Sequence, residues 1–260
     1  MSTLSIAPVA ASCNSAPIAV FTAMAWENAA VRAQLRHVRR EAKGVWQALA
    51  GQRSVCVITG GIGPRRTRET LKQFTDVPFS LVVSAGCAGA LIAGLTPGQL
   101  ILAPEVRMQS GVQKDKYDCF SVDACLLAQA RVAAVQTAIP IAEGPLFTHN
   151  SVLFTSEEKL QHGQKSGALA VEMESGIHAA FAQARQLPFL ALRVILDPVD
   201  MRLPAVANFT TLDGKVRSLR AAAYVATHPH QLPVLLALKR SQTIVAQTIS
   251  RLCTALFPLL

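Results

Sequence analysis

Carboxylates stand where two apolar runs of the chain end. Residues 171–175 read Val-Glu-Met-Glu-Ser, and residues 189–197 form an apolar run that closes on Asp197. Both runs are typical of buried strands, and ligands of open α/β sheets bind at such strand ends. A glutamate there can hold sugar hydroxyls, and an aspartate can protonate a departing purine. The two segments therefore indicate cleavage of a bond between a sugar and a base.

The elements that must position these acids alternate between strands and helices. Apolar runs predict strands at residues 18–23, 54–59, 79–84, 99–103, 139–142, 168–171 and 189–195. Helical spacing and capping residues predict helices at residues 27–43, 67–74, 123–134 and 173–186, and from Gln231 onward. Such alternation predicts a single α/β domain.

Composition restricts the class of protein. The 260 residues are 51% hydrophobic with a mean hydropathy of +0.33, which excludes a disordered chain. The net charge of +9 fits either a solvated surface or an anionic partner. Aromatic residues make up only 5%, so few side chains are left for stacking on nucleic-acid bases, and no nucleic-acid partner is expected. Cysteine and histidine spacings match no metal site, and no cofactor is expected.

The charges divide the chain into three parts. We expect a disordered extension at residues 1–16, a catalytic domain at residues 17–213, and a helical extension at residues 214–260 that is basic and lacks acids. A structural helix is the first interpretation of this tail, and a peripheral membrane contact is the second. The first 26 residues lack the positive charge of a signal peptide, and glycines and prolines break the uncharged stretch 77–104. We therefore expect a cytoplasmic protein. If the tail contacts a membrane, the protein would lie peripherally at the membrane surface.

Two glycine turns follow predicted strands. Residues 60–63, Gly-Gly-Ile-Gly, fit neither a phosphate-binding loop nor a dinucleotide fingerprint, and an ordinary tight turn is the preferred interpretation. Residues 86–89, Gly-Cys-Ala-Gly, are small enough to let the backbone approach a flat ligand.

From residue 18 to about residue 200, the chain resembles the nucleoside phosphorylase superfamily, and most of all its methylthioadenosine/S-adenosylhomocysteine nucleosidase branch. Six segments match in the family's order: 22–27 (TAMAWE), 59–64 (TGGIGP), 84–90 (SAGCAGA), 144–148 (GPLFT), 171–174 (VEME) and 193–200 (RVILDPVD). The resemblance implies a central mixed, twisted sheet flanked by helices. It also implies a homodimer or larger homo-oligomer.

The resemblance also implies roles for individual residues. Asp197 would protonate purine N7, and Glu27 in the first loop would position the attacking water. Glu174 would hold the ribose hydroxyls. The remaining substrate contacts would come from Met24, Cys87, Ala88, Phe147, Thr148, Glu172 and Met173, with Phe147 stacking on the base.

The layout from residue 187 onward resembles the hopanoid-associated phosphorylases, which are implicated in removing adenine from adenosylhopane. Pro198 matches that group. The chain departs from the nucleosidases at Leu196, where they usually carry a serine, and at Pro145, which replaces an acid.

Three functions remain in competition. The first is cleavage of the N-ribosyl bond of adenosylhopane, with water favoured because a carboxylate at Glu27 would repel phosphate; phosphorolysis would gain support if Arg65 and Arg66 reached the site. The second is a nucleosidase for methylthioadenosine or S-adenosylhomocysteine. The third, a non-catalytic adenosine-binding protein, is disfavoured by the joint presence of Glu27, Glu174 and Asp197.

Overall fold

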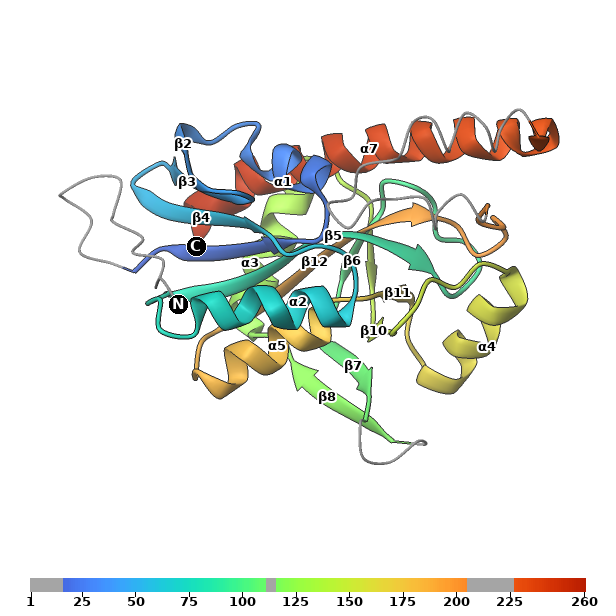
Figure 1. The fold of residues 1–260 in the computed structure, drawn as a ribbon, viewed down its shortest axis with the longest axis horizontal. Coiled ribbons are helices and arrows are strands. Elements are labelled where there is room, and N and C mark those ends of the chain that lie inside the picture. Colours follow the sequence, from blue (N-terminus) through green and yellow to red (C-terminus); the bar gives the residue numbers. More distant parts are fainter. Residues whose placement is uncertain (1–15, 111–115, 205–226) are drawn as a thin grey trace.

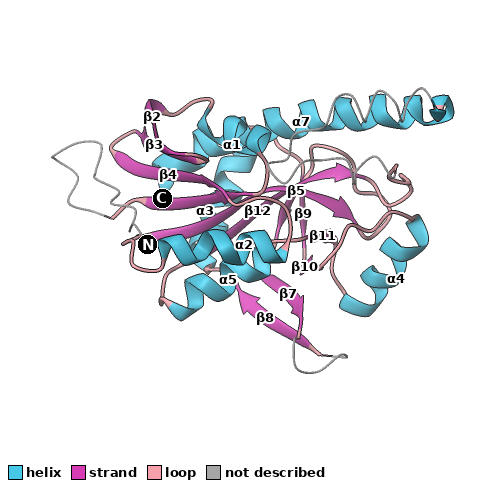
Figure 2. Cartoon of the chain, in the orientation of Figure 1, coloured by secondary structure: helices cyan, strands magenta, loops and turns pink. Residues whose placement is uncertain are grey.

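A twelve-stranded mixed sheet forms the centre of the molecule (Figures 1 and 2). The computed structural model describes residues 16–110, 116–204 and 227–260. Most of the extension expected at residues 1–16, and part of the expected tail, lie outside these ranges. The strands are β1 (Ile18–Thr22), β2 (Arg36–Ala42), β3 (Val45–Ala50), β4 (Arg53–Thr59), β5 (Leu81–Ala90), β6 (Leu100–Leu102), β7 (Glu105–Gln109), β8 (Tyr117–Ser121), β9 (Ile141–Glu143), β10 (Leu146–Thr148), β11 (Ala170–Glu172) and β12 (Phe189–Asp197).

Strand β5 organises the sheet. It pairs in parallel with β1 and with β12, and its last residues pair antiparallel with β11. The main order is β2-β3-β4-β1-β5-β11-β10-β7-β8, while β12 continues into β6 and β9. The carboxyl ends of β5 and β12 run side by side, since Ile195 lies opposite Ala88 and Asp197 opposite Gly89. This pairing brings residues 86–89 beside the predicted acid, and these residues form the end of β5 rather than the predicted turn.

Helices cover both faces of the sheet, as Figure 1 shows. The α-helices are α1 (Ala25–Arg32), α2 (Pro64–Leu71), α3 (Ala124–Gln136), α4 (Ser156–Ser166), α5 (Ser175–Ala184) and α7 (Leu232–Leu256). Helix α7 packs against α1, α3 and β12, whereas α2 and α5 pack together on the other face. The predicted α/β fold with a mixed central sheet is confirmed.

The helix predicted at residues 27–43 is wrong in its second half. Helix α1 ends at Arg32, and residues 36–42 form the edge strand β2. Gly44 takes a left-handed φ of 79° and turns the chain into β3, which pairs with both β2 and β4. The apolar spacing of Val31, Leu35 and Val38 is helical, but pairing in the sheet overrides a short periodicity of this kind.

Strands β3, β7, β8 and β10 and helix α4 were not predicted either. Strands β7 and β8 pair antiparallel, and helix α4 begins at a capping box between Thr155 and Glu158. The tail helix was predicted, and α7 begins one residue after the expected Gln231. Its second half is packed, with Val245, Ile249, Leu252 and Leu256 buried. In the described part of the chain, no helix is both long and apolar enough to cross a bilayer.

Candidate active site

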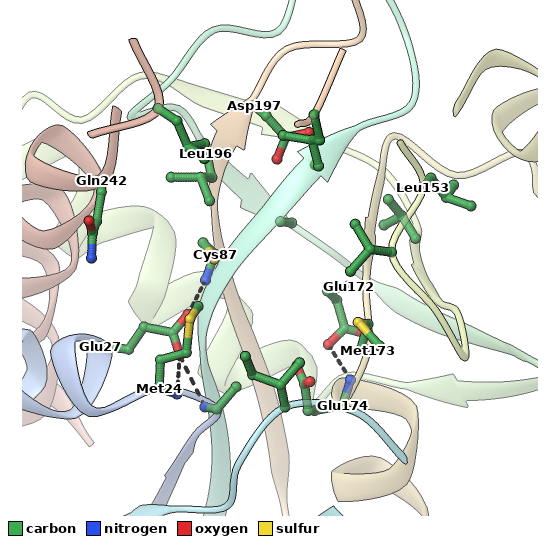
Figure 3. Close-up of a pocket in the computed structure, with 18 of the residues that line it drawn as sticks. Met24, Glu27, Cys87, Leu153, Glu172, Met173, Glu174, Leu196, Asp197 and Gln242 are labelled. Carbon is green, nitrogen blue, oxygen red and sulfur yellow. Dashed lines mark hydrogen bonds between the residues drawn. The ribbon is translucent and has the colours of Figure 1, made fainter. Parts of the chain in front are cut away.

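A cavity of about 420 Å³ opens where β5, β11 and β12 end. Figure 3 shows Asp197 at one end of this space and Glu27 and Glu174 at the other. Eight of the ten predicted site residues line it: Met24, Glu27, Cys87, Ala88, Glu172, Met173, Glu174 and Asp197. The structure therefore gathers in one place residues that lie up to 173 positions apart in the sequence.

Glu27 is held by backbone N–H groups from the loop before α1 and from strand β5. It is the third residue of α1, and its Oε2 accepts hydrogen bonds from the N–H groups of Ala23 (3.0 Å) and Met24 (2.9 Å). Its Oε1 accepts the N–H of Cys87 at 2.9 Å. Burial raises the pKa of Glu27 above its usual value, although Arg193 and these hydrogen bonds oppose the rise. A carboxylate with a pKa moved toward neutrality is suited to act as a general base.

Arg193 is the cation that binds the glutamates together. It is only 1% exposed and lies in the middle of β12. Its Nη2 lies 2.7 Å from Glu172 Oε2 and 3.8 Å from Glu174 Oε2. Gly86 makes room for it, because a Cβ there would stand 2.5 Å from Arg193 Nη1 and 2.7 Å from Glu27 Oε1. The first glycine of the predicted loop therefore serves the carboxylate network.

Glu172 stabilises the start of helix α5. Its Oε2 accepts the backbone N–H groups of Glu174 (2.9 Å) and Ser175 (2.6 Å), and its Oε1 accepts the hydroxyl of Thr148. These donors and Arg193 occupy both oxygens, so Glu172 acts in the wall of the site as a cap for unpaired helix N–H groups.

Glu174 faces the cavity beside Met173. Its Oε1 accepts the N–H of Gly63 at 2.8 Å, so the first glycine turn holds it from across the site. Gly63 has a left-handed φ of 86°, and a Cβ there would meet Met173 Cε at 3.3 Å. Burial and the neighbouring Glu172 raise the pKa of Glu174 to about 8, with Arg193 opposing them. A carboxyl with a raised pKa keeps its proton to a higher pH, and in the protonated form it can both donate and accept hydrogen bonds.

Asp197 forms a buried ion pair with Lys159. Lys159 Nζ lies 2.7 Å from Asp197 Oδ2, and the side chains are 1% and 7% exposed. Burial raises the pKa of Asp197 above its usual value, and Lys159 opposes this rise. Gly89 permits the arrangement, since a Cβ there would stand 2.9 Å from Asp197 Oδ2.

Cys87 contributes its backbone more than its thiol. Its N–H binds Glu27, and its carbonyl accepts Arg193 Nη1 at 3.4 Å. Burial, followed by the charge of Glu27, raises the pKa of the thiol well above its usual value. The thiol is therefore neutral at physiological pH and is a weak nucleophile.

Phe147 and Thr148 lie outside the cavity wall. Strand β10 is enclosed between β7 and β11, and all three of its residues are buried. Phe147 packs in a cluster with Leu91, Leu153 and Val171. Thr148 donates to Glu172 and accepts the N–H of Gly176. The wall is formed instead by residues 151–153, in the loop after the strand.

No role for Lys159 or for the side chain of Arg193 was predicted from the sequence. Arg193 had a visible signal, since it interrupts the apolar run 189–197 with a charge. Lys159 had none, because it stands in a polar helix among exposed residues. Arg65 and Arg66 do not line the cavity, and the side chain of Arg65 is 76% exposed. In the described ranges, no cluster of His, Cys, Asp and Glu has the geometry of a metal site.

The comparisons with known proteins agree with this geometry. The model of the phosphorylase superfamily matches residues 17–226. A search of curated proteins found no match. Among solved structures, the methylthioadenosine/S-adenosylhomocysteine nucleosidase of Neisseria meningitidis, in complex with methylthio-immucillin-A, has a TM-score of 0.73 at 17% identity, covering 94% of this chain and 99% of that one. The corresponding nucleosidase of Helicobacter pylori has a TM-score of 0.72 at 17% identity, with 95% and 100% covered.

Futalosine hydrolase of Helicobacter pylori is similar to the same degree, with a TM-score of 0.72, 17% identity, and 94% and 98% of the two chains covered. At 17% identity, these structural matches show a shared fold and no more. The family is shown by the superfamily model, which matches most of the chain. The chain belongs to the phosphorylase superfamily.

Proposed function

We propose that this enzyme hydrolyses the N-ribosyl bond of an adenine nucleoside. The observation that carries the proposal is the placement of a buried acid, Asp197, across one cavity from Glu27 and Glu174 (Figure 3). Adenine is a poor leaving group until N7 is protonated, and a carboxyl whose pKa is raised by burial can supply that proton. The ribosyl group then develops oxocarbenium character and is attacked from the opposite face.

In the proposed reaction, different lining residues bind the ribose, the base and the attacking water. Glu174 binds the ribose hydroxyls, and Met173 packs against the ring. The base lies toward Asp197, against the backbone of residues 87–89 and the loop 151–153. Glu27 receives a proton from water and directs the hydroxide to the anomeric carbon.

The charges of the described cavity favour water over phosphate. Four acidic side chains line it, whereas the two buried cations are already paired: Arg193 with Glu172, and Lys159 with Asp197. Binding of phosphate would require free cationic or hydroxyl donors, and among the described lining residues these are the exposed Lys239 and Ser151 alone. Arg65 and Arg66, which could have supplied them, do not line the cavity.

Adenine release should therefore be independent of phosphate. We expect the same rate, within about twofold, in phosphate-free buffer and in phosphate buffer of equal ionic strength, measured by chromatography of released adenine. The sugar product should carry a free anomeric hydroxyl in both. Formation of a ribosyl phosphate would contradict hydrolysis and support phosphorolysis.

For the substrate, we propose adenosylhopane, the adenine nucleoside of a triterpenoid. Helix α7 supplies Leu235, Leu238 and Gln242 to the cavity, and Leu196 and Leu203 add to the apolar part of the lining. An apolar mouth of this kind suits a bulky hydrocarbon at the 5′ position. Methylthioadenosine and S-adenosylhomocysteine are the alternative substrates, supported by the fold shared with nucleosidases for these compounds.

An enzyme that acts on a lipid-linked substrate must reach a membrane surface, and we propose that α7 makes this contact. The first turns of α7 read Leu-Pro-Val-Leu-Leu-Ala-Leu-Lys-Arg, and none of the residues 232–240 is buried. Leu232 is 44% exposed and Leu236 is 52% exposed. An apolar helix end with adjacent Lys239 and Arg240 is suited to an anionic bilayer surface. The homo-oligomeric state remains a prediction.

Replacing the exposed leucines tests this contact. The double variant Leu232→Ser, Leu236→Ser should bind vesicles of anionic phospholipid at least about a hundredfold more weakly, since each buried leucine contributes about 1.5–3 kcal/mol and about 1.4 kcal/mol corresponds to tenfold. Its turnover of soluble methylthioadenosine should not change. The control is Val132→Ser, Val135→Ser on α3, whose side chains are likewise exposed. Equal vesicle binding by the leucine variant and the wild-type enzyme in flotation would contradict the membrane contact.

A further inference from the structure

Asp197 is supported by a residue from a distant part of the chain. The nucleosidase branch usually carries a serine just before this acid, but here the position is Leu196, which cannot donate a hydrogen bond. Support comes instead from Lys159 on α4, 38 residues earlier in the sequence. The ammonium lies 2.7 Å from Asp197 Oδ2.

The lysine is fixed by three acceptors. Besides Asp197, its ammonium donates to the carbonyl of Pro198 at 3.0 Å and to that of Met201 at 2.8 Å. An ammonium has three N–H donors, so this set satisfies all of them. The side chain is 1% exposed, and these contacts compensate the cost of burying its charge. The three contacts of Lys159 connect α4 to the turn that follows β12 and fix the direction of the Asp197 carboxyl group.

We propose that Lys159 is a positioning residue for the general acid, and that it stabilises the carboxylate formed when Asp197 gives its proton to the purine. This inference rests on the proposed function. While Asp197 is protonated, the ammonium faces a neutral carboxyl. As the O–H bond of Asp197 breaks and the bond from the proton to N7 forms, the electron pair stays on the carboxylate. Attraction to Lys159 grows during this step, so the interaction is stronger in the transition state than in the bound substrate.

In the free enzyme, the same contact with Lys159 disfavours the protonated form of Asp197 that the reaction requires. An adjacent cation favours the ionised form, whereas burial favours the protonated form. In the folded enzyme burial prevails, and the pKa of Asp197 is raised. Removing Lys159 should therefore leave Asp197 protonated to a higher pH and, at the same time, make it a weaker acid catalyst.

The test is the pH profile of adenine release by Lys159→Gln. The maximal kcat should fall about a hundredfold, KM should change little, and the loss of activity on the alkaline side should move to higher pH. Lys165→Gln, an exposed position on the same helix, serves as the control and should match the wild type. A fall in kcat with an unmoved alkaline side, or an unchanged kcat, would overturn the inference.

A second substrate separates chemistry from folding. p-Nitrophenyl β-D-ribofuranoside has a leaving group that departs without protonation, so its hydrolysis should fall less than threefold in Lys159→Gln. Equal losses on both substrates would identify Lys159 as a purely structural residue. Failure of the wild-type enzyme to release adenine would instead contradict the proposed function. Thermal unfolding of both variants shows whether the fold is retained.

Discussion

Replacing Asp197 by asparagine should reduce adenine release by about a thousandfold, because asparagine cannot supply the proton that purine N7 requires. The side chain keeps its size, and its amide oxygen can still accept a hydrogen bond from Lys159, which lies 2.7 Å from the present Oδ2. Binding of the nucleoside should therefore change by only a few-fold. Single-turnover kinetics and a separate binding measurement distinguish the two effects.

The control for this variant lies on the same turn. Asp200 is exposed and does not line the cavity, so Asp200→Asn should keep full activity. Because Asp197→Asn leaves Lys159 as a buried cation without a counter-charge, thermal stability must be recorded alongside activity. Unchanged adenine release by a folded Asp197→Asn enzyme would remove the aspartate from the role of general acid.

Replacing Glu27 by glutamine should reduce kcat by at least about a hundredfold, since an amide cannot take a proton from water. The carboxylate also accepts three backbone N–H groups, from Ala23, Met24 and Cys87. A glutamine presents an NH₂ to at least one of these donors, which costs about 1–3 kcal/mol of stability. The variant should therefore unfold at a lower temperature while retaining its fold.

Glu69→Gln provides the comparison for Glu27→Gln, because Glu69 is exposed and pairs only loosely with Arg65, at 3.8 Å. Assays well below the unfolding temperature separate lost chemistry from lost folding. Substrate KM should stay within a few-fold of the wild type. Wild-type turnover by Glu27→Gln would show that the water is activated elsewhere.

The acids could be predicted from the sequence because they close strands. Strand β12 reads as an apolar run interrupted by Arg193, and the position of Asp197 at its end is a local property of the chain. The glycines of residues 86–89 have the same local character. Parallel pairing of β5 with β12 then brings both segments together without further information.

Residues whose roles depend on long-range packing could not be predicted. Lys159 looks like a surface lysine of a polar helix until α4 is placed against the turn after β12. Phe147 has the residue type expected for stacking on a base, but its strand is enclosed on both sides and its ring packs into the core. Edge strand β2 has helical spacing, and only its pairing with β3 reveals a strand.

The most direct test of the central claim is adenine release from adenosylhopane in detergent, in phosphate-free buffer prepared in ¹⁸O-water. Hydrolysis with Asp197 as acid and Glu27 as base predicts free adenine and a ribosyl product that carries one ¹⁸O at the anomeric carbon. The reaction should be lost in Asp197→Asn. No release of adenine, or release only after phosphate is added, would contradict hydrolysis of this lipid nucleoside.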